Sequence, residues 1–299
     1  MVELTYIAVC LVIGMALART KKATDQLPSI LATFAIYVSL PALVLKHLHS
    51  LPFESGVLLP SLMPFIVFFL AASFAILIGR FLSLSKPTVG CLILVCGTGN
   101  TSIVGIPLVQ AFVGQDATGY AVVADQANFI VMAVLGLVTA NVYSANEDEN
   151  QSVVHQIVTY PPAIAMLAAL VLRPFEFPFL VESILQMLGS TLTPLAIVSI
   201  GAGMRLSHLS GRVDLFAAGI AMKLVIAPAL IFFLYSFFRN GFDEMAFSVS
   251  VIQAGMPPMI VAGLIAVDRK LDPPLAMMLI SFSIPLSFLT TFLWSTVSV

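Results

Sequence analysis

The sequence predicts an all-α integral membrane protein with ten transmembrane helices, arranged as two inverted repeats of five helices each. Composition is the first observation behind this prediction. Of the 299 residues, 60% are hydrophobic and 9% are charged, whereas soluble domains carry about 25% charged residues. The second observation is a series of ten apolar segments, each near the roughly 20 residues that cross a bilayer. The third is a pair of interrupted segments at equivalent places in the two halves.

Composition also excludes several classes of protein. Nearly all of the chain is membrane segment, so no room remains for a soluble catalytic domain, and no enzyme activity is expected. A net charge of −2 without a long basic run argues against nucleic-acid binding. The three cysteines, Cys10, Cys91 and Cys96, lie in apolar segments without metal-ligand or disulfide spacing, so we expect packing residues. No cofactor is expected.

The five helices of the first half are predicted at 3–18, 28–45, 57–79, 87–113 and 118–143. The first lacks the basic start and the cleavage site of a signal peptide, so we expect a retained helix. The second contains Pro41, and the third is included for its length and apolarity. Glycines and polar residues interrupt the fourth, and the fifth ends at a short acidic link, 144–151.

The five helices of the second half are predicted at 155–172, 179–204, 212–238, 244–267 and 273–298. The sixth and tenth helices are included as apolar segments long enough to cross a bilayer. Pro194 lies inside the seventh, Lys223 inside the eighth, and two adjacent prolines, Pro257 and Pro258, interrupt the ninth.

Lysine and arginine predict the orientation, because positive residues gather on the inner side of a membrane. With the N-terminus outside, nine of these residues fall inside and three outside. The even number of helices then places both termini outside. We expect a multi-pass protein of the cell's inner (plasma) membrane.

The first interruption, 96–102, reads Cys-Gly-Thr-Gly-Asn-Thr-Ser. Glycine weakens a helix, and Ser, Thr and Asn compete for its backbone hydrogen bonds. In lipid, free backbone groups are tolerated only inside protein or beside a cavity. We therefore expect a broken helix whose second half points its positive N-terminal end at a substrate. A flexible kink without a ligand is the alternative.

The second interruption pairs with the first. Pro257 and Pro258 remove two backbone donors and clash with the preceding turn. Pro257 lies 157 residues after Asn100, and Pro194 lies 153 residues after Pro41. Five helices per half force the second half to enter the membrane upside down, so helices four and nine are expected to cross at the bilayer midplane beside a binding site. A lone proline kink is the alternative.

At these residues the chain resembles the auxin efflux carrier family, which shares the fold of bile acid:sodium symporters. The most specific segment is 99–108, Gly-Asn-Thr-Ser-Ile-Val-Gly-Ile-Pro-Leu. Supporting segments are 37–43 (Tyr-Val-Ser-Leu-Pro-Ala-Leu), 188–196 (Leu-Gly-Ser-Thr-Leu-Thr-Pro-Leu-Ala) with Gly201, and Met256-Pro257. The resemblance covers nearly the whole chain.

The resemblance implies one transporter unit, 1–299, with a scaffold at about 1–50 and 155–205 and a moving transport part at about 57–143 and 212–298. A homodimer through helices two and seven and elevator-type alternating access are implied too. Gly99 stands where the family usually has proline, so the crossing is expected to be more flexible. The short link at 144–151 favours a bacterial metabolite over a plant hormone.

The expected binding groups are Asn100, Thr101 and Ser102, at the start of the second half-helix, with Pro257 and Pro258 opening the facing one. Two positive helix ends suit a carboxylate. The alternative is that these groups only satisfy one another. Gly99, Pro107 and Pro257 are expected to shape the crossing.

Asp125 lies roughly 10 Å deep in the fifth helix, at ~1.5 Å per residue. A carboxylate inside a membrane is a functional candidate. It can take a proton, bind sodium, or hydrogen-bond a protonated substrate, and we expect cation coupling at this residue; no other metal site is expected. Its alternative role is structural. Gln126 and Asn128 add polar groups to the expected binding site.

Gln253, one turn before the second break, is expected either to face the cavity or to pack. Lys223 is expected to extend to the inner surface, since long lysine side chains reach for water. The other option is a counter-ion for Asp125 or for the substrate. The four histidines lie near predicted helix ends and suggest interfacial residues.

The sequence thus predicts a secondary transporter of a small organic anion, such as malate, malonate or an auxin-like acid, coupled to H⁺ or Na⁺. The alternatives are a cation/proton antiporter without an organic substrate and a receptor with a transporter fold. The substrate, the direction of transport and the coupling ion stay open.

Overall fold

The computed structural model describes residues 2–20, 26–49, 58–144, 161–172, 174–203, 213–237 and 243–298. The regular elements among these residues are all helices, without a β-strand. Outside them lie residues 145–151 of the acidic link, His155, His208 and six basic residues counted for orientation (Lys21, Lys22, Arg173, Arg205, Arg212 and Arg239). The predicted orientation is therefore left as a prediction.

The elements up to residue 144 are α1 (Val2–Ala18), α2 (Leu27–Phe34), η1 (Ala35–Ser39), α3 (Leu40–His49), α4 (Leu58–Phe81), α5 (Lys86–Gly97), η2 (Thr101–Gly105), α6 (Ile106–Phe112), η3 (Gln115–Ala117), α7 (Thr118–Val131), η4 (Met132–Gly136) and α8 (Leu137–Tyr143). Those that follow are α10 (Pro161–Leu172), α11 (Phe179–Ser190), α12 (Leu192–Gly203), α13 (Val213–Ala221), η6 (Met222–Ile226), α14 (Ala227–Ser236), α15 (Glu244–Ala254), α16 (Ile260–Asp268) and α17 (Pro273–Ser298).

Five continuous helices in the described chain are long and apolar enough to cross a membrane. They are Leu58–Phe81, Thr118–Tyr143, Phe179–Ser199, Val213–Ser236 and Pro273–Ser298. The other described spans are shorter, because several are divided by breaks. An all-helical membrane architecture is thus confirmed, and the count of ten spans and the inverted repeat stay predictions.

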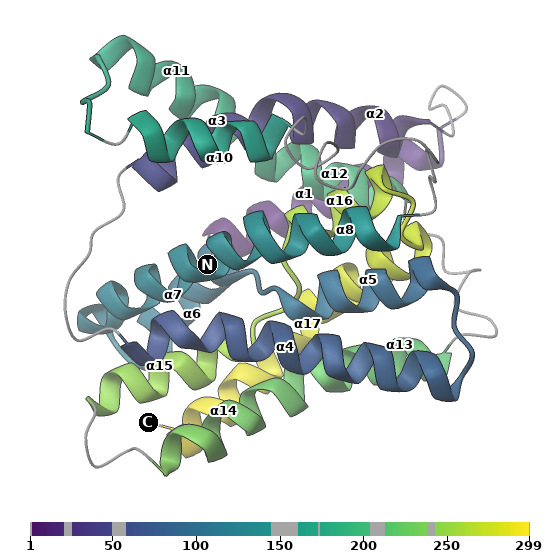
Figure 1. The fold of residues 1–299 in the computed structure, drawn as a ribbon, viewed down its shortest axis with the longest axis vertical. Coiled ribbons are helices and arrows are strands. Elements are labelled where there is room, and N and C mark those ends of the chain that lie inside the picture. The colour runs from purple at the N-terminus through teal and green to yellow at the C-terminus, as the bar shows by residue number, and fades with distance from the viewer. Residues whose placement is uncertain are drawn as a thin grey trace.

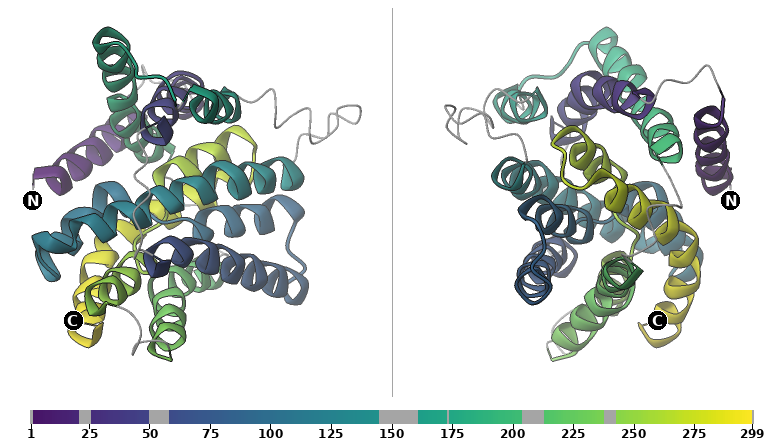
Figure 2. Two further views of the ribbon diagram at one scale, coloured as in Figure 1. Left: turned by 60° about the vertical axis from the view of Figure 1, so that its left-hand side comes forward. Right: turned by 90° about the vertical axis from the view of Figure 1, so that its right-hand side faces the viewer.

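The helices lie in two groups that adjoin through α16 (Figures 1 and 2). In one group, α3 packs against α10 and α11, and α12 packs against α1 and α2. In the other, α4 packs against α5, α7, α14 and α15, and α17 packs against α5, α13 and α15. Helix α16 contacts α2 and α12 on one side and α5 and α17 on the other. A site beside α16 therefore borders both groups.

The two proline-containing spans of the first group touch at their irregular points. A π-helical turn, η1, ends at Ser39, just before Pro41, and α11 gives way to α12 at Thr191, just before Pro194. Proline lacks a backbone N–H and clashes with the preceding turn, which accounts for both irregularities. The hydroxyls of Ser39 and Thr191 are 2.6 Å apart and hydrogen-bonded.

Both predicted helix interruptions are confirmed. Helix α5 ends at Gly97 and the chain resumes helix at Thr101, while α15 ends at Ala254 and α16 begins at Ile260. The two connecting segments meet as an antiparallel pair. The Asn100 N–H donates to the Pro257 carbonyl at 2.7 Å, and the Met259 N–H donates to the Thr98 carbonyl at 3.3 Å. Each break thus satisfies part of the backbone of the other.

Candidate functional site

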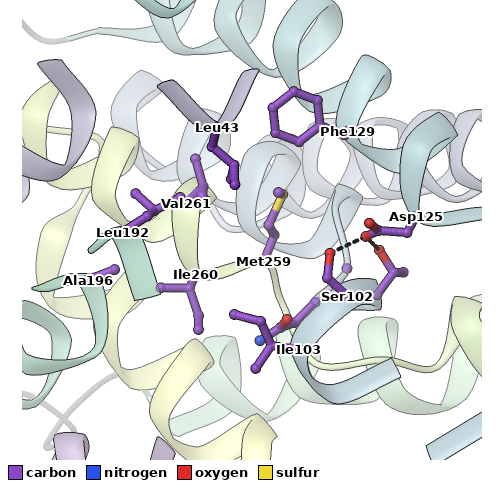
Figure 3. A pocket seen from close by; sticks show the side chains of 13 residues that line it. Leu43, Ser102, Ile103, Asp125, Phe129, Leu192, Ala196, Met259, Ile260 and Val261 are labelled. Atoms are coloured by element: carbon purple, nitrogen blue, oxygen red, sulfur yellow. Dashed lines mark hydrogen bonds between the residues drawn. The ribbon is translucent and has the colours of Figure 1, made fainter. Parts of the chain in front are cut away.

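A cavity of about 220 Å³ lies beside the paired breaks. One wall is the start of the helix Thr101–Phe112, and a second is the start of α16. Helices α3, α7 and α12 close the rest (Figure 3). The lining residues are Leu43, Gly99, Asn100, Thr101, Ser102, Ile103, Asp125, Phe129, Leu192, Ala196, Met259, Ile260 and Val261. Pockets for drug-sized ligands span about 300–1,000 Å³, so this cavity suits a smaller metabolite.

Two helix N-termini face this cavity. The first backbone N–H groups of a helix have no acceptor within that helix, and they carry the positive end of its dipole. Residues 101–103 and 259–261 supply these ends to the cavity wall. Among the lining residues there is no lysine, arginine or histidine. Among the lining residues, positive potential therefore comes from the backbone.

Asp125 is the charged group of the cavity wall, and its side chain is only 6% exposed. The Thr101 hydroxyl donates to its Oδ1 at 2.6 Å, and the Ser102 hydroxyl donates to the same oxygen at 2.5 Å (Figure 3). Charge-assisted hydrogen bonds of this kind are short and strong. They join α7 to the first turn that follows the break.

Asn128, one turn after Asp125 on α7, forms hydrogen bonds with the segment between α5 and Thr101 and with Thr101 itself. Its Oδ1 accepts from the Gly99 N–H at 3.1 Å, and its Nδ2 donates to the Gly99 carbonyl at 2.8 Å and to the Thr101 hydroxyl at 3.2 Å. Proline at position 99 has no N–H to donate. Gly99 therefore makes a contact with Asn128 that a proline could not make in full. This contact constrains the segment that we expected to be more flexible.

The backbone N–H of Asn100 bonds within the protein, whereas its side-chain amide N–H has no acceptor in the described chain. Its backbone N–H is used by Pro257, while its side chain lines the cavity and is 4% exposed. Its Nδ2 has no hydrogen-bond acceptor in the described part of the chain. A buried donor without a partner costs about 1–3 kcal/mol. This amide is therefore an unsatisfied donor of a residue that lines the cavity.

The structure separates the predicted site residues into two sets. Gly99, Asn100, Thr101, Ser102 and Asp125 line the cavity, whereas Gln126, Asn128, Gln253, Pro257 and Pro258 do not. Pro107 lies inside the helix Thr101–Phe112 rather than at the paired segments.

Gln253 packs against the helix after the first break. Its Nε2 donates to the Thr101 carbonyl at 3.3 Å, and its side chain is 1% exposed. A Cβ added at Gly105 would lie 2.2 Å from its Oε1. This places Gln253 in the packing role that the sequence left open, and it explains why residue 105 has no side chain.

The apolar lining was missed by sequence reasoning. Leu43, Phe129, Leu192 and Ala196 are ordinary core residues by pattern, and composition does not distinguish them from lipid-facing ones. A signal did exist in two of the motifs, since 37–43 and 188–196 contain three of these four residues.

The expectation that Lys223 reaches the inner surface is wrong. Its side chain is 1% exposed, and its Nζ donates to the Ala254 carbonyl at 3.2 Å. Lys223 lies in the π-helical turn η6, and its side chain reaches the end of α15. The tendency of lysine to reach for water could not reveal this, because it does not specify the face of the helix on which Lys223 lies.

Comparison with known proteins agrees with this architecture. A family model described as "Membrane transport protein" matches residues 1–295. An uncharacterized transporter of Methanothermobacter thermautotrophicus is 25% identical over 199 residues, which cover 66% of this chain and 64% of that protein. One of Methanocaldococcus jannaschii is 24% identical over 281 residues, which cover 90% of this chain and 89% of that protein. The match over nearly the whole chain confirms the resemblance to the auxin efflux carriers, and the protein belongs to this family of membrane transporters.

Proposed function

We propose that this protein is a secondary transporter of a small organic anion, which binds in the cavity beside the two breaks. The observation that carries the proposal is the meeting of two helix N-termini with the unpartnered Nδ2 of Asn100. Helix N-termini bind carboxylates and phosphates without a cationic side chain. A carboxylate oxygen can accept from Asn100 and from the free backbone N–H groups together.

The lining favours an acid with one carboxylate and an apolar body. The polar groups, Asn100 to Ser102, form one end, and Phe129, Leu192 and Met259 to Val261 form the remainder. A second carboxylate, as in malate or malonate, would meet apolar walls or Asp125. An auxin-like acid or a medium-chain fatty acid fits better, because its apolar part gains from burial.

Cation coupling follows from the position of Asp125. Its carboxylate and a bound carboxylate would share one small cavity, and like charges there repel strongly. We infer that H⁺ or Na⁺ enters with the substrate and offsets this repulsion. Replacing Asp125 with asparagine should therefore remove the pH or sodium dependence of uptake.

The proposal includes the architecture expected from the family. The ten spans form an inverted repeat, α1–α3 and α10–α12 form the scaffold, and the remaining helices move as the transport part. The position of the cavity between the two groups supports this division, because α3 and α12 line one side and α7 and α16 the other. A homodimer through the spans of α3 and α11, in the cell's inner (plasma) membrane with both termini outside, completes the proposal.

Thermal unfolding of the purified protein tests the ligand class. Indole-3-acetate, hexanoate, malate and malonate are each added in sodium and in choline buffer, with indole-3-acetamide as the neutral match of the first. We expect the two monocarboxylates to raise Tm most and the amide to have little effect. Equal shifts by the acid and its amide, or no shift with any acid, would contradict the proposal; a shift with sodium alone would favour the antiporter.

Two variants localise the effect. Asn100→Ala should remove most of the shift by the acid, because it deletes the free donor. Ser73→Ala on α4 is the control, since its hydroxyl bonds only to its own helix at Phe69 and its side chain is exposed. Uptake of the radiolabelled acid by proteoliposomes then separates a transporter from a receptor that binds without transport.

A further inference from the structure

Lys223 has no role in the function proposed so far, yet it is among the largest fully buried side chains in the described chain. Among the residues that the structure describes, Lys223 and Asp125 are the only charged side chains classed as buried, at 1% and 6% exposure. A charge inside a membrane protein is costly unless it is paired or functional. Their joint presence calls for a common explanation.

The ammonium of Lys223 lies near the C-terminal ends of α5 and α15, the helices that precede the two breaks. Its Nζ donates to the carbonyl of Ala254, the last residue of α15. A Cβ added at Gly99 would lie 3.4 Å from the same Nζ, so the ammonium also lies against the segment that follows α5. Helix C-termini carry partial negative charge and favour a cation.

The two buried charges contact one short stretch of chain. Lys223 lies against Gly99, while Asp125 accepts from the hydroxyls of Thr101 and Ser102. Asn128 forms hydrogen bonds with both Gly99 and Thr101. A positive and a negative charge therefore flank residues 99–102 without forming a direct ion pair.

Other charged or titratable groups on the neighbouring elements do not replace Lys223. Helices α4, α5, α13, α14 and α17 pack against η6. Their ionisable residues in the described chain are Arg80, Lys86, Cys91, Cys96, Asp214 and Tyr235. The charged ones lie exposed near helix ends, and the buried Cys96 thiol is directed at the Gly219 carbonyl. Among η6 and the described elements packed against it, Lys223 is thus the only buried positive charge.

We propose that Lys223 is a positioning residue whose fixed positive charge balances Asp125 across residues 99–102 and keeps the empty site electrically neutral. A neutral empty site can return across the membrane without a bound ion, which matters for a carrier that must release its cargo and reset. This second clause rests on the proposed transport function, whereas the charge balance itself does not.

Thermal unfolding without any ligand tests the charge balance through a double-mutant cycle. The variants are Lys223→Met, Asp125→Asn and the two combined. Lys223→Met removes the positive charge that we propose balances Asp125, so it should lower Tm markedly. Adding Asp125→Asn removes that charge, and the double variant should recover roughly half of the loss or more, because interacting sites are not additive.

Lys46 provides the matched control. It lies on α3, outside the crossing, and donates to Gln186, so Lys46→Met and Asp125→Asn should be additive. If Lys223→Met does not fold but the double variant does, the proposal is supported. Additive losses at Lys223, or a double variant no more stable than Lys223→Met, would overturn it.

Flux measurements test the return of the empty carrier. In proteoliposomes with indole-3-acetate, exchange of labelled for unlabelled acid needs no empty return, but net efflux does. Lys223→Met should therefore slow net efflux at least several-fold more than exchange. Equal slowing would overturn the neutral-return clause. Absence of flux in the unaltered protein would instead contradict the proposed function and leave the stability cycle valid.

Discussion

Replacing Asn128 with leucine should destabilise the protein, because the amide satisfies buried backbone groups that leucine cannot satisfy. The side chain is 3% exposed, and it satisfies both backbone groups of Gly99 as well as contacting Thr101. Leucine leaves the Gly99 N–H and carbonyl buried without partners. Each such group costs about 1–3 kcal/mol, so the expected loss is about 2–6 kcal/mol.

Asn141→Leu is the control for this experiment. Asn141 lies on α8, at 7% exposure, and its Nδ2 donates to the Leu137 carbonyl of its own helix. That carbonyl keeps its helical partner when the side chain is removed, so the expected loss is below about 1 kcal/mol. Equilibrium unfolding by SDS in mixed micelles compares the two variants. Equal losses would refute the view that Asn128 supports the broken backbone.

Two further predictions concern packing and pH. Gly105→Ala should lower Tm and weaken acid binding, because its Cβ would meet Gln253 at 2.2 Å, whereas Gly119→Ala, with open space around it, should be neutral or slightly stabilising; similar losses for both would contradict the packing. The Tyr120 hydroxyl, at 2.7 Å, and a backbone N–H at the start of α15 hold the pKa of Asp243 below its usual value. Its stabilising contribution is therefore present above the unfolded pKa and is lost as pH falls through the folded one. Tm measured from pH 7 to pH 3 should fall less for Asp243→Asn, and parallel curves would disprove the assignment.

The breaks and the polar end of the cavity could be predicted because their signals are local. Two glycines beside an Asn-Thr-Ser run, and two adjacent prolines, weaken a helix wherever they occur. Asn100, Thr101 and Asp125 could then be chosen as polar groups in apolar segments. Their role as ligands of a substrate is a prediction.

The remaining features depend on which face of a helix a residue occupies. Lys223 was expected at the inner surface because lysine usually is, but a π-helical turn and the end of α15 place it at the crossing. The apolar wall of the cavity could not be chosen from many similar residues. The contact of Asn128 with Gly99 depends on an extended backbone whose partner is far away in the sequence.

The position of a bound carboxylate tests the central claim most directly. A structure determined with the acid that gives the largest thermal shift should place its carboxylate within hydrogen-bond distance of Asn100 Nδ2 and of the N–H groups that begin the helix at Thr101. An acid bound with its carboxylate at another surface, with this cavity left empty, would contradict the account.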